Sequence, residues 1–282
     1  TSQGELGVGG ANYGTDGQVL TSAGAGAAAA WEDVSVASGA VTGKVEGTNF
    51  TDSLLVGHST TGTLSSAEKN TGVGLDALDA ITQGDRNTCV GYLSGSAINT
   101  GGANTIMGAE TGVALADGIN NTSIGAFSGY YNASGHYNTL IGHSSGQGAS
   151  GQNNSYNSGL GYQSLVAITT GTHNLGLGYA AGNNITSGSG NVVIGNADVS
   201  SATADDQLSI SDGEDGSVVW MTGDSSANVT FAADVTLGDD LLLDSDSCVL
   251  KFGDDQDVTL THTDGTGLTL NSTSKLCFQD TG

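Results

Sequence analysis

The chain has 282 residues, of which 47 are Gly and none is Pro, and its 29 acidic residues against five Lys and Arg give a formal net charge of −24. This charge argues against nucleic acid and anionic membrane surfaces as partners, because both attract clusters of cationic side chains. No run of about 18 apolar residues is present to span a membrane. The three cysteines form neither a CxxC pair nor an even disulfide framework.

Residues 1–48 are expected to form a turn-rich connecting segment. Residues 14–24 are dominated by turn formers, and an Ala- and Gly-rich run then leads to Trp31. We predict a short pair of strands joined by a loop, with Trp31 as an anchor and no chemistry of its own.

Residues 49–197 contain a repeat with the motif Asn-Thr-x-hydrophobic-Gly. Nine copies follow one another at intervals of 17 residues, with a single interval of 19. Position 0 denotes the Asn of a copy, and a column denotes the residues at one position in successive copies. The Asn column comprises Ser53 (with Ser in place of Asn), Asn70, Asn87, Asn104, Asn121, Asn138, Asn157, Asn174 and Asn191.

Four further columns have a uniform character. Position 7 is small, position 11 is aliphatic with a break at Asn132, and position 14 is usually Gly. Two apolar positions separated by Gly corners favour two short strands per copy over a helix, where each Gly costs about 1 kcal/mol relative to Ala. Position 3 is also expected to be buried, and comprises Val56, Val73, Val90, Met107, Ile124, Ile141, Leu160, Leu177 and Ile194.

The repeat predicts an all-β fold, a parallel β-solenoid in which each copy forms one rung about 4.8 Å from the next. Like residues then stack as ladders, and each Asn side chain bonds to the rungs on either side of it. A rung buries about two large apolar side chains, which is marginal against the entropy cost of ordering 17 residues. We therefore expect several chains to associate along their length.

Residues 198–282 are expected to form an acidic module of short strands, a stalk or a tip. They hold 17 of the 29 acids and alternate apolar with polar residues between Asp-Gly turns. Most of these acids are expected to cap turns. Calcium is the one metal ion that the sequence leaves open, because two acidic stretches could supply oxygen ligands. These ligands are Asp212, Glu214 and Asp215 in one stretch and Asp254, Asp255 and Asp257 in another.

Copies such as residues 121–129 resemble the repeats of bacteriophage tail fibres and, at a shorter period, the β-roll heads of trimeric autotransporter adhesins. Residues 17–22 with Trp31, and residues 251–262 followed by 267–270, are similar to other segments of phage fibres. The resemblance implies a homotrimeric fibre on the virion that attaches to the host and joins other tail or fibre proteins. A bacterial surface adhesin or secreted fibril, at the bacterial cell surface, is the alternative.

Motifs that carry chemistry are sparse, so the sequence predicts neither an enzyme nor a cofactor. Depolymerising spikes cut polysaccharide with paired carboxylates. Between residues 87 and 195 only Glu110 and Asp117 are available, at positions 6 and 13 of one copy. A glycan-degrading spike is therefore the third hypothesis. No HxH, HExxH or GxSxG motif points to a metal or a nucleophile.

A receptor contact, to a host glycan or protein, is expected where Tyr, amide and His side chains gather beside the insertion. Tyr offers a flat apolar face with a hydrogen-bonding tip, and insertions in solenoids form exposed loops. At any one of these positions, a role in turn stacking ranks above sugar binding. The candidate receptor-contact residues are Tyr130, Tyr131, His136, Tyr137, Asn153, Asn154 and Tyr156.

Overall fold

A computed structural model describes residues 18–21, 30–33 and 42–237, and these ranges are all-β with no helix. In the first segment, β1 (Gln18–Thr21) and β2 (Ala30–Asp33) form an antiparallel pair. This confirms the strand pair expected within residues 1–48.

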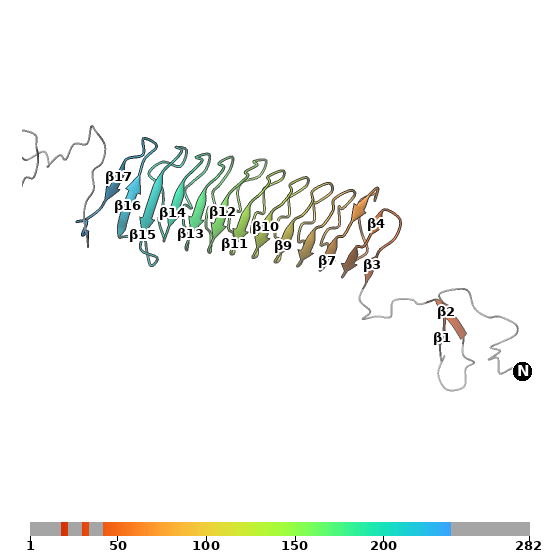
Figure 1. The fold of residues 1–282 in the computed structure, drawn as a ribbon. Coiled ribbons are helices and arrows are strands. Elements are labelled where there is room, and N and C mark those ends of the chain that lie inside the picture. The colour runs from red at the N-terminus through yellow and green to blue at the C-terminus, as the bar shows by residue number, and fades with distance from the viewer. Residues whose placement is uncertain (1–17, 22–29, 34–41, 238–282) are drawn as a thin grey trace, which may run out of the picture. The chain divides into compact units, whose positions relative to one another are not determined.

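The repeat region is a parallel β-solenoid (Figure 1). Each copy of the motif supplies one strand, and each strand pairs in parallel with the strand of the next copy, 17 residues further on or 19 across the insertion. Within residues 42–237 ten strands form this parallel ladder. They are β5 (Leu54–Val56), β7 (Thr71–Val73), β8 (Thr88–Val90), β9 (Thr105–Met107), β10 (Thr122–Ile124), β11 (Thr139–Ile141), β12 (Ser158–Leu160), β13 (Leu175–Leu177), β14 (Val192–Ile194) and β15 (Leu208–Ser211).

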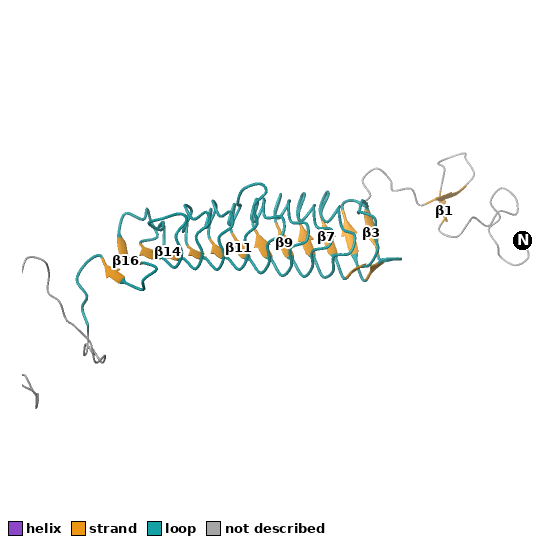
Figure 2. Cartoon of the chain, turned by 90° about the horizontal axis from the view of Figure 1, so that it is seen from above, coloured by secondary structure: helices purple, strands orange, loops and turns teal. Residues whose placement is uncertain are grey.

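Each rung from β7 to β14 has one strand, whereas the sequence led us to expect two (Figure 2). The residues after the motif Gly run through a series of tight turns. Positions 6 and 8 adopt left-handed φ values, as at Glu110 (54°) and Gly112 (57°). These conformations curl the chain too sharply for a second extended segment. Within residues 42–237, a small second sheet is found only at the start of the solenoid, where β4 (Phe50–Thr51) pairs with β6 (Ala67–Glu68).

The sheet continues beyond the boundaries 49 and 197 taken from the sequence. At its beginning β3 (Gly43–Val45) pairs antiparallel with β5. At its end β15 adds a further parallel rung, with Gln207 in the Asn column, and β16 (Val219–Gly223) and β17 (Val229–Phe231) follow in antiparallel order. The change of direction ends the solenoid at both sides of the stack.

The Asn column forms the predicted amide ladder. Asn121 shows the pattern: its Nδ2 donates to Asn104 Oδ1 (3.1 Å) and to the Gly135 carbonyl (2.8 Å). Its Oδ1 accepts from the backbone N–H and the Nδ2 of Asn138, both at 3.0 Å. The ladder starts at the Ser53 hydroxyl and ends at Gln207. Throughout the described residues, every buried side-chain N or O atom has a hydrogen-bond partner.

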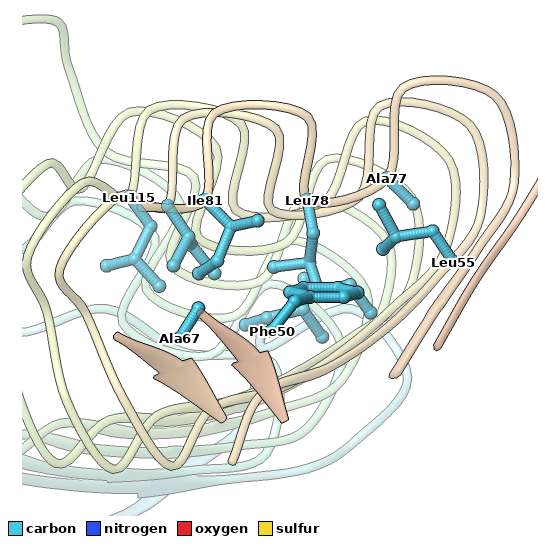
Figure 3. Packing of buried hydrophobic residues seen from close by; sticks show 10 residues of the cluster. Phe50, Leu55, Ala67, Ala77, Leu78, Ile81 and Leu115 are labelled. Carbon is cyan, nitrogen blue, oxygen red and sulfur yellow. The ribbon is translucent and has the colours of Figure 1, made fainter. Parts of the chain in front are cut away.

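The core lies between the sheet and the turns (Figure 3). Position 11 faces it as predicted, and the small residues of position 7 face it as well. Position 11 contributes buried Ile81, Ile98, Leu115, Ile168 and Ile185, and position 7 is buried from Ala77 to Ala181. Leu55 and Phe50 close the core at the first rungs, where Figure 3 places them beside Leu78 and Ala77.

The expectation that position 3 is buried is wrong. None of its nine residues is buried, and Val73, Met107, Leu160 and Leu177 are 38 to 48% exposed. Position 2 points inward in its place, because successive side chains of a strand alternate between its faces. The inward column comprises Leu55, Gly72, Cys89, Ile106, Ser123, Leu140, Gly159, Gly176 and Val193, all buried.

Position 2 varies in size because position 8 shares the same space. Gly72 is followed by Leu78 and Gly159 by Leu165, and both Leu side chains are fully buried although their φ values are positive (61° and 53°). In the other rungs from 87 to 190 position 8 is Gly. In the rung of Asn174 both positions are Gly (Gly176 and Gly182), and the side chain of Leu165 from the preceding rung lies beside them. The core therefore stays filled although the large side chain comes from different columns.

The motif Gly at position 4 is required by close approach of the rungs. Gly142 has a φ of 137°, a conformation that L side chains rarely adopt. A Cβ added there would also press on the carbonyl oxygen of Gly161 in the next rung.

Candidate functional surface

The insertion forms an exposed loop over residues 149–153, as predicted, and Asn153 and Ser155 at its C-terminal end hold it against the preceding rung. Asn153 Oδ1 accepts hydrogen bonds from the backbone N–H groups of Ala133 (3.1 Å) and Ser134 (2.9 Å). Ser155 Oγ accepts from His136 N–H (3.0 Å). The loop is therefore anchored through its C-terminal end.

Asn154 is 2% exposed and serves the core. Its carbonyl oxygen accepts from Asn132 Nδ2 (2.9 Å) and from Asn138 Nδ2 (3.0 Å), and its N–H donates to Asn132 Oδ1 (3.3 Å). This explains the break of the aliphatic column at Asn132, because two buried amides satisfy each other where an aliphatic side chain would otherwise pack. The structure therefore uses the carbonyl, the N–H and the Oδ1 of Asn154 for contacts within the chain.

The predicted tyrosines form two groups. The rings of Tyr130 and Tyr131 meet edge to face with their centroids 4.6 Å apart. The rings of Tyr137 and Tyr156 stack in parallel at 5.2 Å and 11°. His136 is half-buried, and its Nδ1 accepts from Ile119 N–H (3.1 Å), so its ring is fixed by the preceding rung.

The Tyr137 and Tyr156 stack has a third member that sequence reasoning missed. His173 stacks on Tyr156 at 4.8 Å and 7°. All three residues directly precede the Asn of their rungs, and this shared position was the available signal. We call this set the first aromatic column.

A second aromatic column follows the motif Gly of the same three rungs. Its members are His143, Tyr162 and Tyr179, with centroids 5.4 and 5.3 Å apart and ring planes within 18°. Phe127 of the preceding rung meets His143 edge to face at 5.5 Å. The spacing between rungs is close to the stacking distance of aromatic rings, so each column also ties its rungs together.

Stacking determines what these columns offer to a ligand. The middle ring of each column, Tyr156 or Tyr162, has a ring stacked on both of its faces, whereas the residue as a whole is 48% or 43% exposed. Its edge and hydroxyl are therefore the parts left to solvent. A sugar that packs on an aromatic face finds no such face on a middle ring, and a row of hydroxyls is presented in its place. The edge-to-face pair of Tyr130 and Tyr131, with Tyr131 36% exposed, lies outside both columns.

The acidic turn at residues 212–216 is organised by its own backbone. Asp212 Oδ1 accepts from the N–H groups of Glu214, Asp215 and Gly216, and Oδ2 accepts from Val218 N–H at 2.8 Å. These bonds, the one from Val218 first, lower the pKa of Asp212 to about 2. Asp212 therefore acts as a turn cap. Asp254, Asp255 and Asp257 lie outside the described residues.

No group of three or more His, Cys, Asp or Glu side chains is placed to hold a metal ion within residues 42–237 and the two short N-terminal ranges. Glu110 and Asp117 lie on two different turns of their rung. Cys89 is a free thiol in the inward column, where burial raises its pKa. Over the same ranges, no helix is long and apolar enough to cross a membrane.

Comparisons with protein-family models, with curated proteins and with solved structures found no match to this chain.

Proposed function

We propose that the chain is a structural component of a phage tail fibre, located on the virion, which gives reach and attaches to a host surface, in the first place to a glycan. The observation that carries the structural role is the ladder of rungs. Each added 17-residue copy lengthens the stack by about 4.8 Å and repeats the same hydrogen bonds and core contacts. Such a chain can be extended without a new fold, which is what a spacer needs.

The surface composition supports attachment to an uncharged or polar partner. From residue 87 to residue 195 the solenoid carries two acids and no Lys or Arg. Tyr side chains and the anchored insertion loop supply apolar edges and hydroxyl groups on this neutral surface. Association as a homotrimer and joining to other fibre proteins belong to the same proposal, which rests on the resemblance of the repeats to phage fibres.

Electron microscopy tests the location. Antibodies raised against the purified chain are applied to virus particles and to bacterial cells that encode it. We expect label on the tails of virions. Label on the cell envelope alone would overturn the phage assignment and support the bacterial adhesin.

Binding to envelope glycans tests the attachment. The full chain is incubated with purified lipopolysaccharides and capsular polysaccharides, and a Tyr131→Ala variant is compared with a Thr170→Ala variant, which alters an exposed residue in another rung. We expect Tyr131→Ala alone to weaken binding. No binding by the unaltered chain would refute the glycan receptor, and new reducing ends in the polysaccharide would support a degrading spike.

A further inference from the structure

The outer face of the sheet, defined by positions 1 and 3 of strands β5 to β15, is uncharged along its whole length and carries a continuous aliphatic column at position 3. Position 3 is Val, Met, Ile or Leu in every strand, ending at Ile210, and position 1 is Thr, Ser, Leu or Val. Neither position holds a charged residue in any of these ten strands. Every side chain at position 3 is half-buried or exposed.

This outer face is an extended uncharged strip on the surface of the sheet. Ten strands about 4.8 Å apart, each three residues wide, present a strip of roughly 43 by 10 Å, or about 430 Å². Contiguous apolar patches of a few hundred Å² on soluble proteins are often interaction sites. A column of aliphatic residues in every rung therefore requires an explanation outside the single chain, because the core does not use it.

We infer that the outer face is a self-association surface and that its partner is a second copy of this chain. The first reason is spacing. Rows of side chains on the face repeat at the distance between rungs, and another copy has the same rows at the same distance. Two such faces interdigitate over all ten strands, whereas a partner with a different period loses the match within a few rungs.

The second reason is charge. The chain has a net charge of −24, so copies repel one another wherever acids face acids. The outer face is a strip from which charge is absent, and it allows close contact without burying carboxylates. A cationic partner would have no carboxylate to pair with on this face.

Area sets the extent of the contact. About 430 Å² from each copy is roughly half of the 800 Å² per partner that a stable interface typically buries. We therefore expect the contact to spread onto the adjoining column at position 5, where Leu75, Tyr92 and Tyr179 are 48 to 55% exposed. The inference stands on these surfaces and does not depend on the chain being a phage fibre.

Sedimentation velocity of the full chain over a range of concentrations tests the inference. Leu177→Glu places a carboxylate on the outer face, where the side chain is 40% exposed. Thr170→Glu is the matched control, since Thr170 is exposed and Asp117 already holds a carboxylate at the same position of another rung. We expect the unaltered chain and Thr170→Glu to sediment as the same oligomer. Leu177→Glu is expected to sediment as a single chain with its β-sheet circular dichroism retained.

A second variant keeps the test decisive if Leu177→Glu does not fold. Leu177→Thr introduces a residue that already occurs at position 1 of the same face, and we expect association at least tenfold weaker than in the unaltered chain. A single-chain mass for the unaltered protein at all concentrations would overturn the inference, as would an unchanged oligomer in a folded Leu177→Glu or Leu177→Thr. These results are independent of where antibodies label the virion or the cell.

Discussion

The amide ladder makes its strongest prediction at Asn121, in the middle of the stack. Asn121→Ala removes the acceptor of the Asn138 backbone N–H and the donor to the Gly135 carbonyl. Both groups belong to buried residues. An unsatisfied buried polar group costs about 1 to 3 kcal/mol, so the two together lower the free energy of unfolding by about 2 to 6 kcal/mol. This is a large share of the 5 to 15 kcal/mol typical of a folded domain.

Guanidinium unfolding followed by circular dichroism measures this loss. All samples are held at one chain concentration, because self-association adds to apparent stability. Asn99→Ala is the matched control, since Asn99 is exposed and is hydrogen-bonded to the two neighbouring rungs through its backbone N–H and carbonyl, which the substitution keeps. Hydrogen exchange at the Asn138 N–H gives a local measurement, with about tenfold faster exchange expected for each 1.4 kcal/mol lost. The role given to the ladder is refuted if Asn121→Ala costs no more than Asn99→Ala.

Three further predictions concern the turns, the core and the acidic cap. In Gly142→Ala the added Cβ clashes with the Gly161 carbonyl, and the residue must adopt a φ of 137°. We expect this variant to lose at least about 1 to 3 kcal/mol of its free energy of unfolding. Gly47→Ala is the control and should be near neutral, because no atom lies within 4 Å of its added Cβ. Leu165→Ala empties a fully buried site and should cost about 2 to 5 kcal/mol by the same unfolding assay; a cost below 1 kcal/mol would contradict the packing described for position 8. The pKa of Asp212 lies at about 2, below the value of about 3.9 in an unfolded chain, so its contribution to stability is complete above about pH 4 and is lost as the pH falls through 2. Carboxyl titration by NMR should place it there, and an unshifted Asp212 would refute the turn geometry.

The period and the amide ladder were predictable because a repeat places each residue in the environment of its equivalents. An Asn that recurs every 17 residues beside Gly and an aliphatic residue can stack on its own copies, and the structure confirms this from Ser53 to Gln207. The insertion loop was predictable for the same reason. A 19-residue copy must place its two extra residues where they do not disturb the ladder.

The direction of the side chains was not predictable from hydrophobicity. Position 3 is uniformly aliphatic, which predicts a buried column, yet its side chains face outward. The inward position 2 includes small residues such as Gly72 and Ser123. The core tolerates this mixture because Leu78 and Leu165 fill the space left by glycines. The residue types of a single column therefore do not show whether it is buried when side chains from two columns fill the same space in the core.

The candidate receptor residues were brought together only in part. Tyr137 and Tyr156 stack as neighbours of the ladder, and Asn153 anchors the loop. Asn154 turns into the core because Asn132 is already there to bind it, a pairing between residues 22 positions apart. His173 completes the first aromatic column through a position in the rung rather than through proximity in the chain.

The sequence by itself determined the fold class, the spacing of the rungs and the identity of the ladder residues, because exact repetition forces equivalent residues into register. Only the tertiary structure decided which apolar column lies inside. The single strand of each rung sets the alternation of inward and outward side chains, and the left-handed turns that follow it return the chain on the side of position 2. Position 3 was left on the outside, where we propose that a second copy of the chain packs.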